Sequence, residues 1–336
     1  MIDIDSTQGA SAIGMDIGTS RIVAAVPDGN GIKVQSQLNA FVAIPYSKLT
    51  EKALKQELVP HTLNGGEILV HGTASERFAD LMNADTRRPM LRGFLNSDER
   101  DGVRVITEIA RMLAGAASQK AQKVCFSVPA PPLGGEDNLT YHEAALKHVF
   151  GELGYEASSV TEGLAVIYSE LADNNYTGIG ISLGGGLCNV CFAYLSTPMI
   201  AFSIPKAGDF IDASAAAVMS ERSNRVRILK EESFYLNGHT PAEKLNQVLT
   251  VYYDDMIRSL VGALNDAFAR TRNIPRLGKP VPLVLSGGTA LPKGFRDRFE
   301  KALRASDFPL PLSEIRMAGE PLNATARGAL IAALSD

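Results

Sequence analysis

Two similar glycine-containing segments lie almost half a chain apart in this sequence. Residues 13–20 read IGMDIGTS and residues 179–186 read IGISLGGG, an offset of 166 residues in a chain of 336. Each segment predicts an apolar strand, a glycine turn and a second strand. Backbone N–H groups at such turns can approach an anion without interference from a Cβ atom. The repeat by itself is equally compatible with two related lobes whose turns grip one set of phosphates and with two unrelated β-hairpins.

Charge and cysteine content narrow the classes of protein that this chain can be. Its net charge is −4, from 33 basic and 37 acidic side chains, which argues against a nucleic-acid-binding role. Three cysteines are too few for a disulfide framework. Cys188 and Cys191 lie three residues apart on a predicted strand and point to opposite faces, which favours buried core cysteines over a zinc or redox site. The N-terminal segment lacks the pattern of a signal peptide, so we expect a cytoplasmic protein.

The stretch from 174 to 205 contains no charged residue and is long enough on paper to span a bilayer. Glycines and a proline interrupt it, so we predict three buried strands instead. Elsewhere strand patterns alternate with helix patterns, which predicts a mixed α/β fold with helices packed on sheets. No GxxxxGK[ST] loop occurs, and the glycine spacing at 178–184 does not match GxGxxG, so a P-loop or Rossmann enzyme is disfavoured.

A third glycine turn lies in VLSGGTALPKGFRDRFEKAL at 284–303, where a predicted strand ends and a helix begins. With the first two turns, in this chain order, it resembles the actin-like ATPase superfamily, which includes actin, MreB, the seventy-kilodalton heat-shock chaperones and sugar kinases. The first segment resembles the phosphate-1 loop, GISLGGGLCNV at 180–190 the phosphate-2 loop, and the third the adenosine motif. Further resembling segments are RRPMLRGFLN at 87–96, TEGLAVIYSEL at 161–171, AGDFID at 207–212, VRILKEESFYL at 226–236 and EPLNATARGALIAAL at 320–334.

The resemblance implies a two-lobed actin-like fold, related to ribonuclease H, with duplicated mixed-sheet domains and a nucleotide in the cleft between them. Lobe I is expected at 1–173, with a small upper subdomain at about 38–90 and a connecting helix at about 161–172. Lobe II is expected at 174–336, with a helical upper subdomain at about 221–275 and the adenosine motif at 284–295. The implied function is a prokaryotic cytoskeletal protein that binds ATP or ADP with Mg²⁺, assembles head-to-tail into filaments and hydrolyses ATP slowly.

The family motifs also imply roles for single residues. Asp16 would hold the metal, because Mg²⁺ prefers oxygen ligands, and Glu162 would position the attacking water. Lys230 and Glu231 would border the base and ribose, and Asp209 would lie near the hinge. The residues expected to contact the nucleotide from the three turns are Gly18, Thr19, Ser20, Gly184, Gly185, Gly186, Gly287, Gly288 and Thr289. Each role has a structural alternative. Asp16 could be a turn aspartate that satisfies backbone donors, and Glu162 an acid that complements the dipole of its helix. Lys230 and Glu231 could be a solvated charge pair, and the third glycine turn an ordinary turn between a strand and a helix.

Ser182 departs from the family pattern, because most members carry aspartate at this point of the phosphate-2 loop. Serine cannot supply that negative charge, so metal binding would depend on Asp16 and the nucleotide. Slow hydrolysis, a shifted metal site and binding without turnover all stay open. The alternative function is therefore a non-polymerising actin-fold adaptor, or pseudo-ATPase, that binds nucleotide and a protein partner. A small-molecule kinase is disfavoured because no substrate-binding insertion is evident.

Membrane contact is a weaker expectation. Met90, Leu91, Phe94 and Leu95 form an apolar cluster in a segment where some MreB proteins touch the membrane. No basic amphipathic helix accompanies the cluster, which favours packing in the core.

Overall fold

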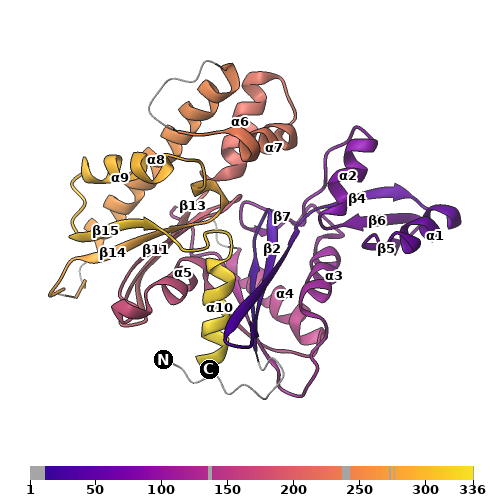
Figure 1. The fold of residues 1–336 in the computed structure, drawn as a ribbon, viewed down its shortest axis with the longest axis horizontal. Coiled ribbons are helices and arrows are strands. Elements are labelled where there is room, and N and C mark those ends of the chain that lie inside the picture. The colour runs from indigo at the N-terminus through magenta and orange to yellow at the C-terminus, as the bar shows by residue number, and fades with distance from the viewer. Residues whose placement is uncertain (1–11, 135–137, 237–242, 272–273, 276, 336) are drawn as a thin grey trace.

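Two five-stranded mixed sheets form the body of the molecule (Figure 1). The computed structural model describes residues 12–134, 138–236, 243–271, 274–275 and 277–335. The first sheet has the strand order β10-β9-β1-β2-β3 and the second has the order β13-β12-β11-β14-β15. The strands of the first sheet are β1 (Ala12–Ile17), β2 (Arg21–Asp28), β3 (Gly31–Leu38), β9 (Lys123–Val128) and β10 (Glu156–Thr161). Those of the second are β11 (Gly178–Leu183), β12 (Cys188–Tyr194), β13 (Thr197–Ile204), β14 (Val281–Ser286) and β15 (Leu312–Met317).

The two sheets share one topology. In each, three successive strands pair antiparallel, β1-β2-β3 in one sheet and β11-β12-β13 in the other. The first strand of each set also pairs in parallel with a later strand, β9 or β14, which in turn pairs in parallel with β10 or β15. The half-chain repeat in the sequence therefore reflects a duplicated fold, and the predicted mixed α/β class is confirmed. The uncharged stretch forms β11, β12 and β13, as predicted.

Two helices, α5 (Glu162–Glu170) and α10 (Ala324–Ser335), lie between the sheets (Figure 1). Their small and aliphatic side chains share one core with residues of both sheets, such as Val23 and Val284. The helices approach so closely that a Cβ atom added at Gly328 would overlap the carbonyl oxygen of Ala165. Helix α10 follows the strands of the second sheet in the chain, yet it packs against β1 and β9 of the first.

Further helices cover the outer faces of the sheets. On the first sheet, α3 (Gly102–Ala114) and α4 (Leu139–Glu152) pack over a core that includes Met15 and Phe126. On the second, α6 (Gly208–Met219), α8 (Lys244–Arg270) and α9 (Phe295–Arg304) pack over a core that includes Ile181 and Leu285. The remaining helical elements of this half are α7 (Ser223–Ser233) and the 3₁₀ turns η1 (Ala172–Asn174) and η2 (Gly288–Ala290).

A small three-stranded sheet projects from the first sheet, between β3 and α3 in the chain (Figure 1). It consists of β4 (Phe41–Pro45), β5 (His61–Asn64) and β6 (Glu67–His71), with α1 (Lys48–Gln56) and α2 (Ala74–Leu81) beside it. The hairpin of β7 (Met90–Leu91) and β8 (Phe94–Leu95) follows. Met90 is buried in the core of the first sheet, Leu95 packs against that core and Phe94 contacts the ring of His142, whereas Leu91 is exposed, so three of the four apolar residues serve packing.

The cysteines behave as the strand pattern predicts. All three are buried. Cys188 packs in the outer core of the second sheet, and Cys191 packs on the opposite face, against the helices between the sheets. Among the described residues, no helix combines the length and apolar character that crossing a membrane requires.

Candidate functional site

A cavity of about 510 Å³ opens between the two lobes. Its size is typical of small-molecule sites, which range over roughly 300–1,000 Å³. It is lined by every residue that the motifs assigned to the nucleotide or the metal: Asp16, Gly18, Thr19, Ser20, Glu162, Gly184, Gly185, Gly186, Asp209, Lys230, Glu231, Gly287, Gly288 and Thr289. These residues come from the end of β1 and the turn after it, the turn after β11, the starts of α5 and α6, the last turns of α7, and the turn after β14.

The two glycine turns have the same construction and face each other. The N–H of Gly18 donates to the carbonyl of Arg21 at 3.0 Å, and the N–H of Gly184 donates to that of Leu187 at 3.0 Å. A Cβ atom added at Gly185 would overlap the Ser20 hydroxyl, so the turns from opposite sheets meet without space for a side chain. This close approach explains why glycine is needed there.

The turn after β14 is fixed to the second of these turns. Thr289 Oγ1 donates to the carbonyl oxygen of Gly184 at 2.7 Å. Gly287 has φ of 93°, a left-handed conformation that favours glycine, and a Cβ atom there would overlap the backbone of Leu183. All three glycine turns of the sequence therefore meet at one side of the cavity.

Two carboxyl groups face the cavity near the glycine turns. Asp16, near the end of β1, accepts a hydrogen bond from Ser127 Oγ at 2.7 Å, and burial raises the pKa of this carboxyl to about 6. Glu162, the first residue of α5, accepts a hydrogen bond from Ser182 Oγ at 2.8 Å. Burial and the neighbouring Asp16 raise the pKa of Glu162 to about 8. Ser182 thus places a neutral hydroxyl beside Glu162, and a carboxylate at this position would add a third acidic group to Asp16 and Glu162.

The donor set at Asp16 suits a hard divalent cation. Its carboxylate lines the cavity beside the glycine turns, and Mg²⁺ binds through one or two carboxylates together with phosphate oxygens and water. In the part of the chain that the structure describes, no group of three His, Cys, Asp or Glu side chains forms a site made of protein alone. Such a cation would therefore depend on Asp16 and on a bound phosphate group.

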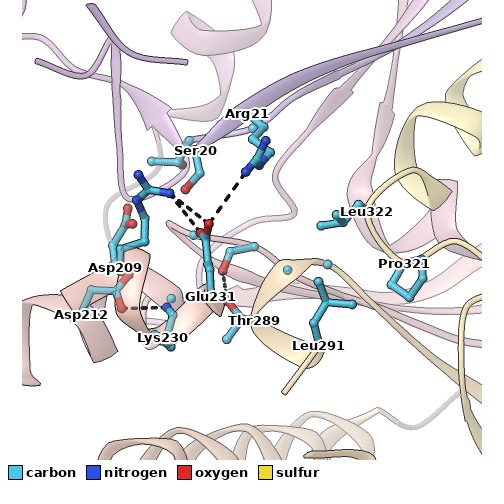
Figure 2. A pocket seen from close by; sticks show the side chains of 18 of the residues that line it. Ser20, Arg21, Asp209, Asp212, Lys230, Glu231, Thr289, Leu291, Pro321 and Leu322 are labelled. Carbon is cyan, nitrogen blue, oxygen red and sulfur yellow. Dashed lines mark hydrogen bonds and ion pairs between the residues drawn. The ribbon is translucent and has the colours of Figure 1, made fainter. Parts of the chain in front are cut away.

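Charged residues of α6 and α7 form another part of the cavity wall (Figure 2). The Lys230 ammonium pairs with Asp212 at 2.7 Å, and both side chains are less than a tenth exposed. Burial raises the pKa of Asp212, and Lys230 opposes this shift. Glu231 instead faces Arg21 of β2 across the cleft, at 3.8 Å.

The cavity has an apolar part opposite these charges. Figure 2 shows Leu291, Pro321 and Leu322 on one side of the cavity, and Asp209 and Asp212 on the other. Leu291 and Leu322 are each 47% exposed although they line a cavity, so they present apolar surface that a flat ring could cover. The site thus combines a glycine-lined part, an acidic part and an apolar part.

Sequence reasoning missed several residues that shape this site. Arg227 of α7 contacts Glu231 at 3.1 Å and also forms an ion pair with Glu76 of α2, across the cleft. The four-residue spacing of Arg227 and Glu231 on a helix could have revealed that pair. Arg88, in the segment before β7, lies 3.0 Å from Asp209, and no local pattern signals a contact between residues 121 positions apart.

The duplicated sheets, joined by two helices around a cavity with facing glycine turns, give this chain an actin-like fold, as the sequence motifs predicted. Solved structures with this fold include a MamK double helical filament, with a TM-score of 0.71 and 18% identity over 96% of this chain and 98% of that chain. MreB 5 of Spiroplasma citri bound to AMPPNP has a TM-score of 0.68 and 16% identity over 96% of each chain. The ethanolamine utilization protein EutJ from Carboxydothermus hydrogenoformans has a TM-score of 0.56 and 16% identity over 95% of this chain and 89% of that chain.

A narrower assignment comes from the sequence family. Residues 11–333 match the family model named Volactin, so the chain belongs to the Volactin family. No protein of curated function matches the sequence.

Proposed function

We propose that this protein binds ATP with Mg²⁺ in the cavity between its lobes and assembles head-to-tail into filaments. The observation that carries the proposal is the pair of facing glycine turns, one from each duplicated sheet, beside an apolar pocket wall. The solved structures with this fold include one bound to AMPPNP and one that is a double helical filament, which supports both parts of the proposal.

Different parts of the cavity suit the phosphates, the base and the ribose of a nucleotide. The phosphates would lie between the turns, where the backbone N–H groups and the hydroxyls of Thr19 and Ser20 can donate. The base would cover Leu291 and Leu322, and the ribose hydroxyls would face Glu231. Lys230 is committed to Asp212, so its contribution would be to position α7 rather than to meet the base with a free ammonium group.

Hydrolysis would depend on Asp16 and Glu162. Asp16 would hold Mg²⁺, which neutralises charge on the phosphates when it is bound. The Glu162 carboxylate can accept a proton from a water that attacks the terminal phosphorus, while the bond from that phosphorus to the bridging oxygen breaks. The Ser182 hydroxyl holds Glu162 Oε2 at 2.8 Å, so it would position this carboxylate.

Filament growth follows from the symmetry of the contact. A head-to-tail interface joins two different surfaces and does not close, so it extends into a polymer. Nucleotide that bridges the lobes would fix their relative orientation and favour the contact. Hydrolysis would then loosen the lobes and the polymer.

Electron microscopy and sedimentation of the purified protein test this function. We expect filaments with ATP or AMPPNP and Mg²⁺, fewer with ADP, and none for Asp16→Asn with any nucleotide. A protein that stays monomeric at high concentration with every nucleotide would contradict the filament proposal.

Ser182 supports a second candidate, a non-polymerising adaptor that binds nucleotide and a protein partner without turnover. The neutral hydroxyl leaves the second glycine turn without the carboxylate that most actin-like proteins carry there. Calorimetry that shows ATP binding, no phosphate release and a monomer in solution would favour this candidate. Phosphate release that stays unchanged in Ser182→Asp would mean that the serine does not set the rate.

A further inference from the structure

Arg88 lies where the two glycine turns meet. It belongs to the segment between α2 and β7, and its side chain is 27% exposed. Its Nη1 atom donates to Asp209 Oδ1 at 3.0 Å and to Ser20 Oγ at 3.3 Å. The contact with Asp209 joins the first lobe to the second, and the contact with Ser20 joins Arg88 to the first glycine turn.

Both partners of Arg88 belong to the wall of the cavity. Ser20 is part of the turn after β1, and Asp209 lies in the first turn of α6. The N–H of Asp209 donates to the carbonyl oxygen of Gly185 at 2.8 Å, which fixes the start of α6 to the second glycine turn. A Cβ atom at Gly185 would lie 3.3 Å from Asp209 Oδ1 and would overlap the Ser20 hydroxyl. The Arg88 guanidinium is therefore held beside both turns at once.

The chemistry of arginine suits this place. A guanidinium carries five N–H donors in a planar fork, and it binds phosphate oxygens through charge-assisted hydrogen bonds. In the described part of the chain, Nη1 makes both side-chain contacts of Arg88, which leaves donors on Nη2 and Nε for a ligand. A terminal phosphate between the turns would compete with the Asp209 carboxylate for this cation.

We propose that Arg88 distinguishes a nucleoside triphosphate from a diphosphate by exchanging Asp209 for the terminal phosphate. The inference rests on the proposed nucleotide binding in this cavity. With a diphosphate, Arg88 stays on Asp209 and Ser20, as in this structure. With a triphosphate, it contacts the terminal phosphate and connects the segment before β7 to the ligand.

Binding affinities for AMPPNP and ADP, measured by calorimetry with Mg²⁺, test the proposal. We expect Arg88→Gln to weaken AMPPNP binding about tenfold, the equivalent of one charge-assisted hydrogen bond, and to change ADP binding less than about twofold. Arg77→Gln removes an exposed arginine from the neighbouring helix α2 and should leave both affinities unchanged. Asp209→Asn removes the competing carboxylate, so it should raise the preference for AMPPNP over ADP.

The outcomes separate this proposal from the one on which it rests. If Arg88→Gln weakens both ligands equally, or neither, Arg88 only fastens the lobes and the proposal is overturned. If Arg88→Gln does not fold, an unchanged AMPPNP-to-ADP ratio in Asp209→Asn overturns it in the same way. A wild-type protein that binds neither nucleotide overturns the proposed function itself.

Discussion

Replacing Ser182 with aspartate restores the common residue of the phosphate-2 loop, and we expect it to destabilise the nucleotide-free protein. Ser182 is only 4% exposed, and its hydroxyl lies 2.8 Å from Glu162 Oε2. The new carboxyl could stay neutral, which at pH 7 costs about 4 kcal/mol for a group with an ordinary pKa of about 3.9. It could instead stay charged beside Glu162, whose raised pKa of about 8 keeps that carboxyl mostly protonated at pH 7, and the penalty is then the burial of the new charge.

The cost of the neutral form is the upper limit, so we expect a loss of about 2–4 kcal/mol in the free energy of unfolding at pH 7. At pH 5 the neutral form costs only about 1.5 kcal/mol, so the loss should shrink. Urea unfolding followed by far-UV circular dichroism measures both values, since the chain has no tryptophan to report on folding.

Ser182→Asn is the matched control, because it has the shape of aspartate without the charge, and its loss should not depend on pH. A loss below about 1 kcal/mol for Ser182→Asp at pH 7, or an equal loss at both pH values, would refute the electrostatic reasoning. Under the proposed function, Mg²⁺ and ATP should recover more stability in Ser182→Asp than in the wild type, because the cation would neutralise the added carboxylate.

Two further changes probe other parts of the fold. Gly328→Ala should lower the free energy of unfolding by about 3 kcal/mol or more, because its Cβ atom would overlap the carbonyl of Ala165. Gly262→Ala on α8, with open space around it, is the control and should be neutral or stabilising. Urea midpoints compare the two variants, and equal effects would show that α5 and α10 can separate freely. Burial lowers the pKa of His142 to about 4, from an ordinary value near 6.5, so protonation favours the unfolded chain and stability is lost as the pH falls from about 6.5 toward 4. At pH 5 this loss is about 2 kcal/mol. The free energy of unfolding should therefore differ between pH 7 and pH 5 by about 2 kcal/mol less in His142→Gln than in the wild type. The same difference in both proteins would contradict the assignment to His142.

The sequence predicts the strands and turns of the site well, for a physical reason. A tight approach of two backbones requires glycine, and glycine is visible in the sequence wherever it is needed. At Gly185 and at Gly287 there is no space for a Cβ atom, so the glycine in the motif directly indicates the close backbone approach in the structure. The strand alternation predicts in the same way that Cys188 and Cys191 face different layers.

The charged network is less accessible to sequence reasoning, because an ion pair can form between any two residues that the fold brings together. The motifs predict Lys230 beside the base, but they do not indicate that its ammonium pairs with Asp212, a residue that they did not single out. The contact of Arg88 with Asp209 spans the two lobes and depends on how they meet. Side-chain partners of this kind follow from tertiary structure rather than from local pattern.

The position of α10 has a consequence for how the chain folds during synthesis. This helix covers β1 and β9, yet the ribosome makes it only after all the strands of both sheets. The inner apolar face of the first sheet therefore stays uncovered while the whole second lobe is translated, even though nascent domains generally fold from the N-terminus. A nascent chain released before α10 would expose one face of its first sheet to chaperones and proteases.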